Sequence, residues 1–102
     1  MIKPIIEPFK VIHKFLGRNG TLAKELSGYE YRDEQVQMAL AVLKDLQDGG
    51  ILMVEAGTGT GKTLAYLLPA LLSNRRVIIS TGTKTLQEQI FYKDLPLMKK
   101  HF

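Results

Sequence analysis

Apolar residues recur at helical spacing through the first half of the chain. This pattern predicts three amphipathic helices, over residues 9–16, 21–26 and 33–47. Gly17 is expected to end the first helix, which packs on the rest of the domain. Thr21 and Asp33 are candidate N-caps of the second and third helices, because their side-chain oxygens can accept from free backbone N–H groups.

Two short apolar runs, residues 51–54 and 77–80, are typical of buried β-strands. Between them, residues 62–73 have helical spacing, with Pro69 as a potential kink. Strand, helix and strand form a βαβ unit, whose two strands should be parallel. The pattern therefore predicts an α/β fold with helices before, between and after the strands.

Residues 55–63 read Glu-Ala-Gly-Thr-Gly-Thr-Gly-Lys-Thr and join the first predicted strand to the next helix. Glycines let the backbone wrap closely around a phosphate, and the helix start adds inward N–H groups and a positive dipole end. Lys62 can reach the β- and γ-phosphates, and Thr63 can ligate Mg²⁺. Ala56 replaces the usual first glycine. The flanking elements favour a P-loop over a chance glycine-rich turn.

A run of hydroxyl side chains, residues 80–85, follows the second predicted strand. The carboxyl ends of parallel strands share one edge of a sheet, so this run should lie beside the phosphate loop. Thr85 and Glu88 fit a capping box that opens a helix through residues 90–91. The run is either a capping loop or, with Lys84, a contact to a nucleic-acid backbone.

Arg32 and Gln35 stand at the start of the predicted 33–47 helix. A glutamine amide offers both a donor and an acceptor to a purine edge. A solvated surface position explains Gln35 equally well, and the residues alone leave both interpretations open.

Composition limits the class of protein. The 102 residues suit one small domain, and 45% hydrophobic with 24% charged residues is ordinary for a globular protein. The sequence has no apolar run of membrane-spanning length and no secretory signal, so we expect a cytoplasmic protein without a membrane partner. Cysteine is absent, and the net charge of +4 fits a polyanionic partner.

A complete P-loop ATPase also needs an acidic strand end for Mg²⁺ and the catalytic water. No apolar run after Thr63 ends in Asp-Glu. We therefore expect an N-terminal piece of a larger protein, with an exposed sheet edge that favours self-association.

Three segments resemble the DinG-like helicases, bacterial relatives of the XPD helicases in superfamily 2. Residues 29–35, Tyr-Glu-Tyr-Arg-Asp-Glu-Gln, are similar to the Q motif. Residues 55–70 are similar to motif I and its usual continuation. Residues 80–90, with Lys-Asp-Leu-Pro-Leu at 93–97, are similar to motif Ia and are the most particular of the three.

The resemblance implies a role for individual residues of this chain. Gln35 would read the adenine of ATP, with Arg32 supporting that pocket. The resemblance places the phosphates and Mg²⁺ on Ala56, Gly57, Thr58, Gly59, Thr60, Gly61, Lys62 and Thr63, with Lys62 and Thr63 catalytic and Thr63 the metal ligand. It places single-stranded DNA on Thr81, Thr83, Lys84 and Gln87. An iron–sulfur cluster of the family would need cysteines from outside these residues.

The leading hypothesis is that the chain is the N-terminal part of an ATP-dependent DNA helicase that serves repair or replication. Its fold would be a truncated three-layer P-loop NTPase (RecA-like) fold with parallel strands. Residues 1–28 would form a lead-in segment and residues 29–102 the first part of motor domain 1. The alternatives are a non-enzymatic nucleotide- or nucleic-acid-binding module and a P-loop kinase of a small metabolite.

Overall fold

The computed structural model describes residues 7–55 and 62–101, and every regular element in these ranges is helical. In chain order the elements are α1 (Pro8–Leu16), α2 (Thr21–Glu25), α3 (Asp33–Asp48), α4 (Lys62–Leu72), α5 (Lys84–Gln89), the π-helical turn η1 (Ile90–Asp94) and α6 (Leu95–Lys99). The predicted helices are confirmed, and the ends of the first four coincide with the prediction or differ from it by one residue. The last of them does not stop near residue 91 but continues through η1 into α6.

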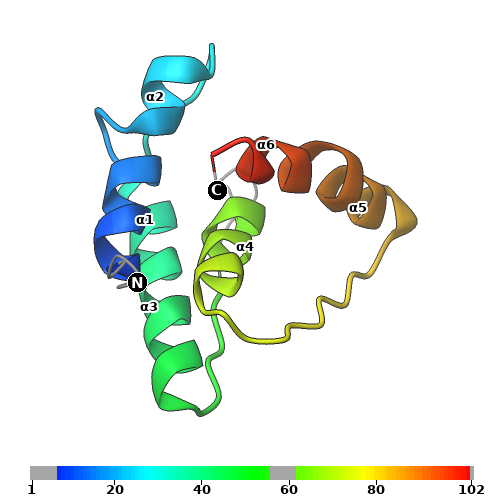
Figure 1. Cartoon of the computed structure of the whole chain (residues 1–102). Coiled ribbons are helices and arrows are strands. Elements are labelled where there is room, and N and C mark those ends of the chain that lie inside the picture. Colours follow the sequence, from blue (N-terminus) through cyan, green and yellow to red (C-terminus); the bar gives the residue numbers. More distant parts are fainter. Residues whose placement is uncertain (1–6, 56–61, 102) are drawn as a thin grey trace, which may run out of the picture.

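Helices α1, α3 and α4 pack side by side and supply most of the core (Figure 1). Each helix contributes apolar residues spaced three or four apart, as one buried helical face requires. The buried apolar side chains of the described residues are Ile12, Phe15, Leu16, Leu22, Val36, Ala39, Leu43, Ala65, Leu67, Leu68, Ile90 and Met98.

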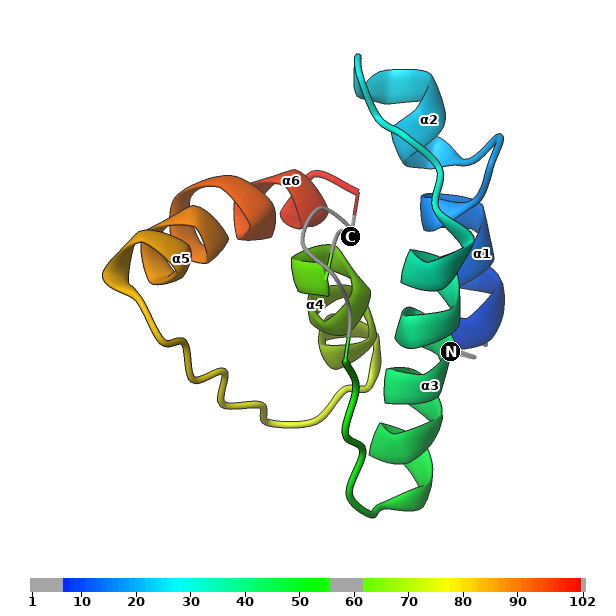
Figure 2. The same cartoon turned by 180° about the vertical axis from the view of Figure 1, so that it is seen from behind.

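Helices α3 and α4 run in the same direction, so their N-terminal ends lie at one end of the pair (Figures 1 and 2). Gly49 ends α3 with a φ of 79°, a conformation that glycine adopts without strain, as the sequence predicted. Helix α4 continues through Pro69, whose ring is fully buried. This pairing brings the starts of the Q-motif helix and the P-loop helix to a common end.

The caps differ from the sequence prediction. Gly20 and Arg32 occupy the N-cap positions of α2 and α3, and neither helix start has a side-chain cap. Thr83 caps α5, because its Oγ1 accepts from the backbone N–H of Leu86 at 3.1 Å. The prediction that Thr85 opens this helix was therefore wrong by two residues.

The predicted α/β fold is also wrong for this structure. The described residues contain no strand, and within them no backbone hydrogen bond joins the apolar run 51–54 to the run 77–80. Both runs are extended, yet Ile51, Met53 and Ile78 are 93%, 91% and 92% exposed. A strand is stable only when neighbouring strands satisfy its backbone and cover its side chains, and two short runs are too few. The predicted three-layer sheet and its exposed edge are absent from the described ranges.

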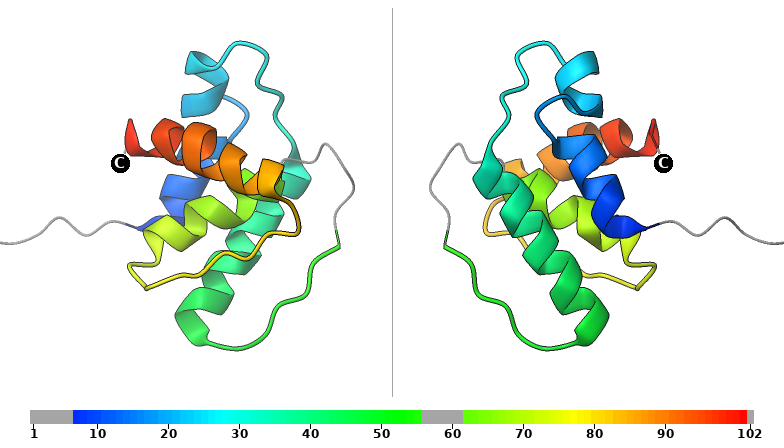
Figure 3. Two further views of the ribbon diagram at one scale, coloured as in Figure 1. Left: turned by 90° about the vertical axis from the view of Figure 1, so that its right-hand side faces the viewer. Right: turned by 90° about the vertical axis from the view of Figure 1, so that its left-hand side faces the viewer.

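The C-terminal limb, residues 76–99, leaves the helical core and returns to it. Figure 3 shows the extended residues 76–83 crossing to α5, after which η1 and α6 lead back toward α1 and α2. His101 closes this path, because its Nε2 lies 2.9 Å from Glu25 Oε2. Its ring also meets Phe15 edge-on, with 5.5 Å between the ring centroids.

Candidate nucleotide and nucleic-acid sites

Lys62 and Thr63 form the first turn of α4, as the sequence predicted for the end of a P-loop. Lys62 is exposed and Thr63 half-buried. The helix is eleven residues long, so its free N–H groups and positive dipole end add to the charge of Lys62. The remaining P-loop positions, Ala56 to Gly61, lie outside the described residues. An ammonium group and a hydroxyl at a helix start are chemically suited to phosphate and Mg²⁺.

Gln35 lies in the first turn of α3 with only 4% of its surface exposed. Its Oε1 lies 3.1 Å from the hydroxyl of Tyr29, which is 2.7 Å from the carbonyl oxygen of Leu16. The Tyr29 hydroxyl has one proton, which these two acceptor oxygens share. The Tyr29 hydroxyl therefore ties the connector to α1 and holds the Gln35 amide. The interpretation of Gln35 as a solvated surface residue is wrong.

Arg32 precedes α3 and pairs with Glu30, with 3.1 Å between Nη2 and Oε2. Both side chains are open to solvent, so this ion pair contributes little to stability. Arg32 therefore remains available to a ligand at the shared end of α3 and α4. Its adenine-supporting role, like that of Gln35, stays a prediction.

Tyr29 and Tyr31 belong to the same connector, and sequence reasoning assigned neither of them a role. Burial raises the pKa of the Tyr29 hydroxyl above its ordinary value, and the neighbouring Tyr31 raises it further. The guanidinium of Arg18 lies over the Tyr31 ring, 4.9 Å from its centroid. Two tyrosines directly before a helix start were the available signal for this anchor.

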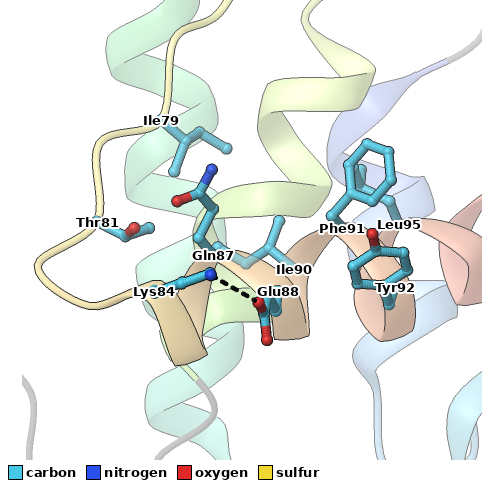
Figure 4. Close-up of a pocket in the computed structure, with 9 residues that line it drawn as sticks. All are labelled: Ile79, Thr81, Lys84, Gln87, Glu88, Ile90, Phe91, Tyr92 and Leu95. Carbon is cyan, nitrogen blue, oxygen red and sulfur yellow. Dashed lines mark ion pairs between the residues drawn. The ribbon is translucent and has the colours of Figure 1, made fainter.

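The second candidate site lies along α5 and the extended segment before it. Thr81, Lys84 and Gln87 line one cavity of about 430 Å³ (Figure 4). The structure therefore brings together three of the four residues predicted to contact DNA. The fourth, Thr83, caps α5 and accepts at its backbone oxygen a hydrogen bond of 3.2 Å from the Thr81 hydroxyl. Capping thus explains Thr83 without a ligand.

Phe91 and Tyr92 line the same cavity and were missed by sequence reasoning. Figure 4 shows them beside Leu95, with Thr81, Lys84 and Gln87 at the other end. Two adjacent aromatic residues, soon after the polar run Gln87-Glu88-Gln89, were the signal that could have found them.

Residues 7–55 and 62–101 do not form a metal centre from protein ligands alone. In the described ranges no three His, Asp or Glu side chains gather closely enough to hold a metal ion. The sequence contains no cysteine, so the chain provides no thiolate for an iron–sulfur cluster. Mg²⁺ binding through Thr63 needs the phosphate oxygens of a nucleotide as further ligands. Among the described helices, none is long and apolar enough to cross a membrane.

The chain is similar to known helicases. It is 54% identical over 82 residues to the ATP-dependent DNA helicase YoaA of Haemophilus influenzae and to that of Escherichia coli. These matches cover 80% of this chain but only 13% of each relative. The 3'-5' exonuclease DinG of Staphylococcus aureus is 44% identical over 77 residues, which are 72% of this chain and 9% of that protein.

The chain thus spans about an eighth or less of the length of these relatives. No solved structure matches it significantly. The relatives confirm the DinG-like resemblance that the motifs indicated. The profile of the DEAD/DEAH box helicases matches residues 33–100, from the first residue of α3 to just beyond α6. The chain belongs to the DEAD/DEAH box helicase family.

Proposed function

We propose that this chain is the nucleotide-binding part of an ATP-dependent DNA helicase that moves along single-stranded DNA. The observation that carries the proposal is the 54% identity to relatives named ATP-dependent DNA helicase, in a chain whose Lys62 and Thr63 open α4. The exposed Lys62 and the shared end of α3 and α4 support it.

In this proposal ATP and Mg²⁺ bind at the start of α4. Lys62 neutralises charge on the β- and γ-phosphates, and the Thr63 hydroxyl ligates the metal ion. Mg²⁺ supplies further charge neutralisation when it is bound. Gln35 and Arg32 lie at the same end of the helix pair, where they can orient the base of the nucleotide. The Gln35 amide is held in place by Tyr29 and needs little reordering to do so.

Thr81, Lys84 and Gln87 contact the DNA strand in this proposal. Hydroxyl, amide and ammonium donors are the usual partners of phosphate oxygens. Such contacts position a strand without reading its sequence, which suits a protein that moves along DNA.

Binding of a fluorescent ATP analogue in the presence of MgCl₂ tests the proposal. Lys62→Ala should weaken binding about 10- to 100-fold, because a charge-assisted contact to phosphate is lost. Lys44→Ala is the matched control, since Lys44 is an exposed lysine on the outer face of α3. Equal affinities of the parent and Lys62→Ala, or no binding by the parent, would contradict the nucleotide-binding role.

The 102-residue chain itself should hydrolyse ATP at a negligible rate. It lacks an acidic strand end and an arginine from a second motor domain, and the arginine alone is worth roughly 10³–10⁵ in rate. Mg²⁺-dependent turnover that disappears in Lys62→Ala would show that the chain completes its own catalytic site.

A further inference from the structure

Phe91 and Tyr92 stand out from the other aromatic residues of the chain. Their side chains are 63% and 74% exposed, more than any other Phe or Tyr in the described ranges. The two rings meet edge to face, with 5.0 Å between centroids and an interplanar angle of 80°. The pair thus presents a large apolar surface to solvent, which is costly unless something binds there.

The backbone places these rings at a local irregularity. Residues Ile90–Asp94 form the π-helical turn η1 between α5 and α6. This wider turn buries Ile90 and Asp94 and leaves the two intervening aromatic side chains outside. Single π-helical turns inside helices occur frequently at functional sites.

The aromatic pair shares its cavity with the predicted DNA contacts. Lys84, Gln87 and Phe91 are spaced three and four residues apart and therefore lie on one helical face. About 10 Å of helix separates Lys84 from Phe91 at the usual rise per residue. A backbone phosphate at one end and a nearby unpaired base at the other can therefore occupy the same cavity (Figure 4).

Charge decides which occupant fits best. Lys84 pairs with Glu88 at 4.0 Å, but the two side chains are 87% and 55% exposed, so this pair is weak and easily exchanged. The polar end offers the ammonium group of Lys84 and the amide of Gln87, and the Thr81 hydroxyl can rotate from the Thr83 backbone oxygen to a phosphate oxygen. These donors suit phosphate, whereas an apolar peptide would leave them without acceptors.

We propose that Phe91 and Tyr92 form a stacking platform for unpaired nucleobases of a single strand whose backbone lies along Thr81, Lys84 and Gln87. This inference rests on the proposed function and names the part of the ligand that the cavity selects. A duplex keeps its bases stacked inside, so the platform favours single strands. Every base has a π-face, and binding at the platform is therefore tolerant of sequence.

The test is fluorescence anisotropy of the 102-residue chain with a labelled oligothymidylate and with an abasic strand of equal length. Replacing both rings, Phe91→Ala with Tyr92→Ala, should weaken binding of the oligothymidylate about 5- to 150-fold. Affinity for the abasic strand should stay unchanged, and so should the dependence on salt, because the phosphate contacts remain.

Three further variants separate stacking from simple packing. Tyr92→Phe keeps a ring and should keep the affinity, whereas Phe91→Leu keeps apolar bulk and should lose part of it. Phe9→Ala removes the half-exposed ring of α1 and is the matched control, with no expected change. Far-UV circular dichroism shows whether the double variant retains its helices. If the double variant loses its helices, the DNA affinities of Phe91→Leu and Tyr92→Phe decide whether the rings stack on bases.

The outcomes separate this inference from the proposed function. Binding that depends on Lys84 but is equal in the parent and the ring variants would overturn the stacking platform only. No binding of either strand by the parent, even at low salt, would overturn the DNA-binding role and the platform together. A ring variant that changes the oligomeric state, measured by sedimentation, without changing DNA affinity would show that a second copy covers the rings.

Discussion

Helix α3 and helix α5 show two different uses of a helical face. Four of the sixteen residues of α3 are buried, among them Val36, Ala39 and Leu43 on one stripe. None of the six residues of α5 is buried, and Lys84, Gln87 and Glu88 line a cavity together with an aromatic pair. A buried helical face stabilises the core, whereas the exposed face of α5 adds little stability and is the surface to which we assign a ligand in our proposal.

The largest expected effect comes from the core. Leu43→Ala removes a fully buried core side chain of α3 and should lower the free energy of unfolding by about 2–5 kcal/mol. Leu71→Ala, at a position 45% exposed on α4, should cost under about 1 kcal/mol. Chemical denaturation of both variants measures the contrast. Equal losses would mean that the core is not centred between these helices.

An intermediate effect is expected in the limb. Thr83→Ala removes the cap that accepts from the Leu86 N–H and should cost α5 about 1 kcal/mol of local stability. Hydrogen exchange should accelerate at Leu86 and leave the amides of α3 unchanged. Thr85→Ala is the control, because Thr85 lies inside α5 and caps nothing. Faster exchange in α3 as well would show that limb and core unfold as one unit.

The smallest expected effect on the free energy of unfolding is at Asp94, in η1 of the C-terminal limb. Burial raises the pKa of the Asp94 carboxyl above its ordinary value of 3.8, against the lowering effects of Gln89 and Lys93. The folded chain therefore holds this proton to higher pH than the unfolded chain, and stability falls as pH rises through that window. At neutral pH, Asp94→Asn should raise stability by about 1 kcal/mol or less, because no charge is then buried.

Thermal unfolding at several pH values measures this effect. The advantage of Asp94→Asn should shrink as pH falls from the raised pKa of the folded chain toward 3.8, and below 3.8 it should stay constant because the parent carboxyl is then protonated in both states. Glu55→Gln, at an exposed carboxyl in the extended segment, should give no such convergence. A gain that persists at low pH would show that packing, and not charge, sets the stability at this position.

The helices could be predicted because their signals are local. Apolar spacing in residues 33–47 gave α3, and the glycines after Asp48 gave its end. Capping was harder to predict, because Thr83 and Thr85 offer the same oxygen two residues apart. Only the path of the chain into α5 decides which of them meets the Leu86 N–H.

The strands could not be predicted in the same way. The apolar run 51–54 has the composition of a buried strand, but Ile51 and Met53 lie exposed because no neighbouring chain pairs with them. Strand pairing needs backbone hydrogen bonds between two segments, so the sequence of one apolar run cannot show whether a partner strand will be present. The burial of Gln35 against Tyr29 has the same non-local cause, because the Tyr29 hydroxyl also contacts the Leu16 carbonyl oxygen of α1.

The amino-acid sequence alone is enough to predict the positions of the helices, the start of α4 at Lys62 and, through its motifs, membership of a helicase family. Only the tertiary structure decided that α3 and α4 share an N-terminal end, that Tyr29 anchors Gln35, and that one cavity joins Lys84 to the exposed aromatic pair. The physical reason is range. Spacing and capping act within a few residues, whereas burial, pairing and shared cavities depend on segments that the fold alone brings together.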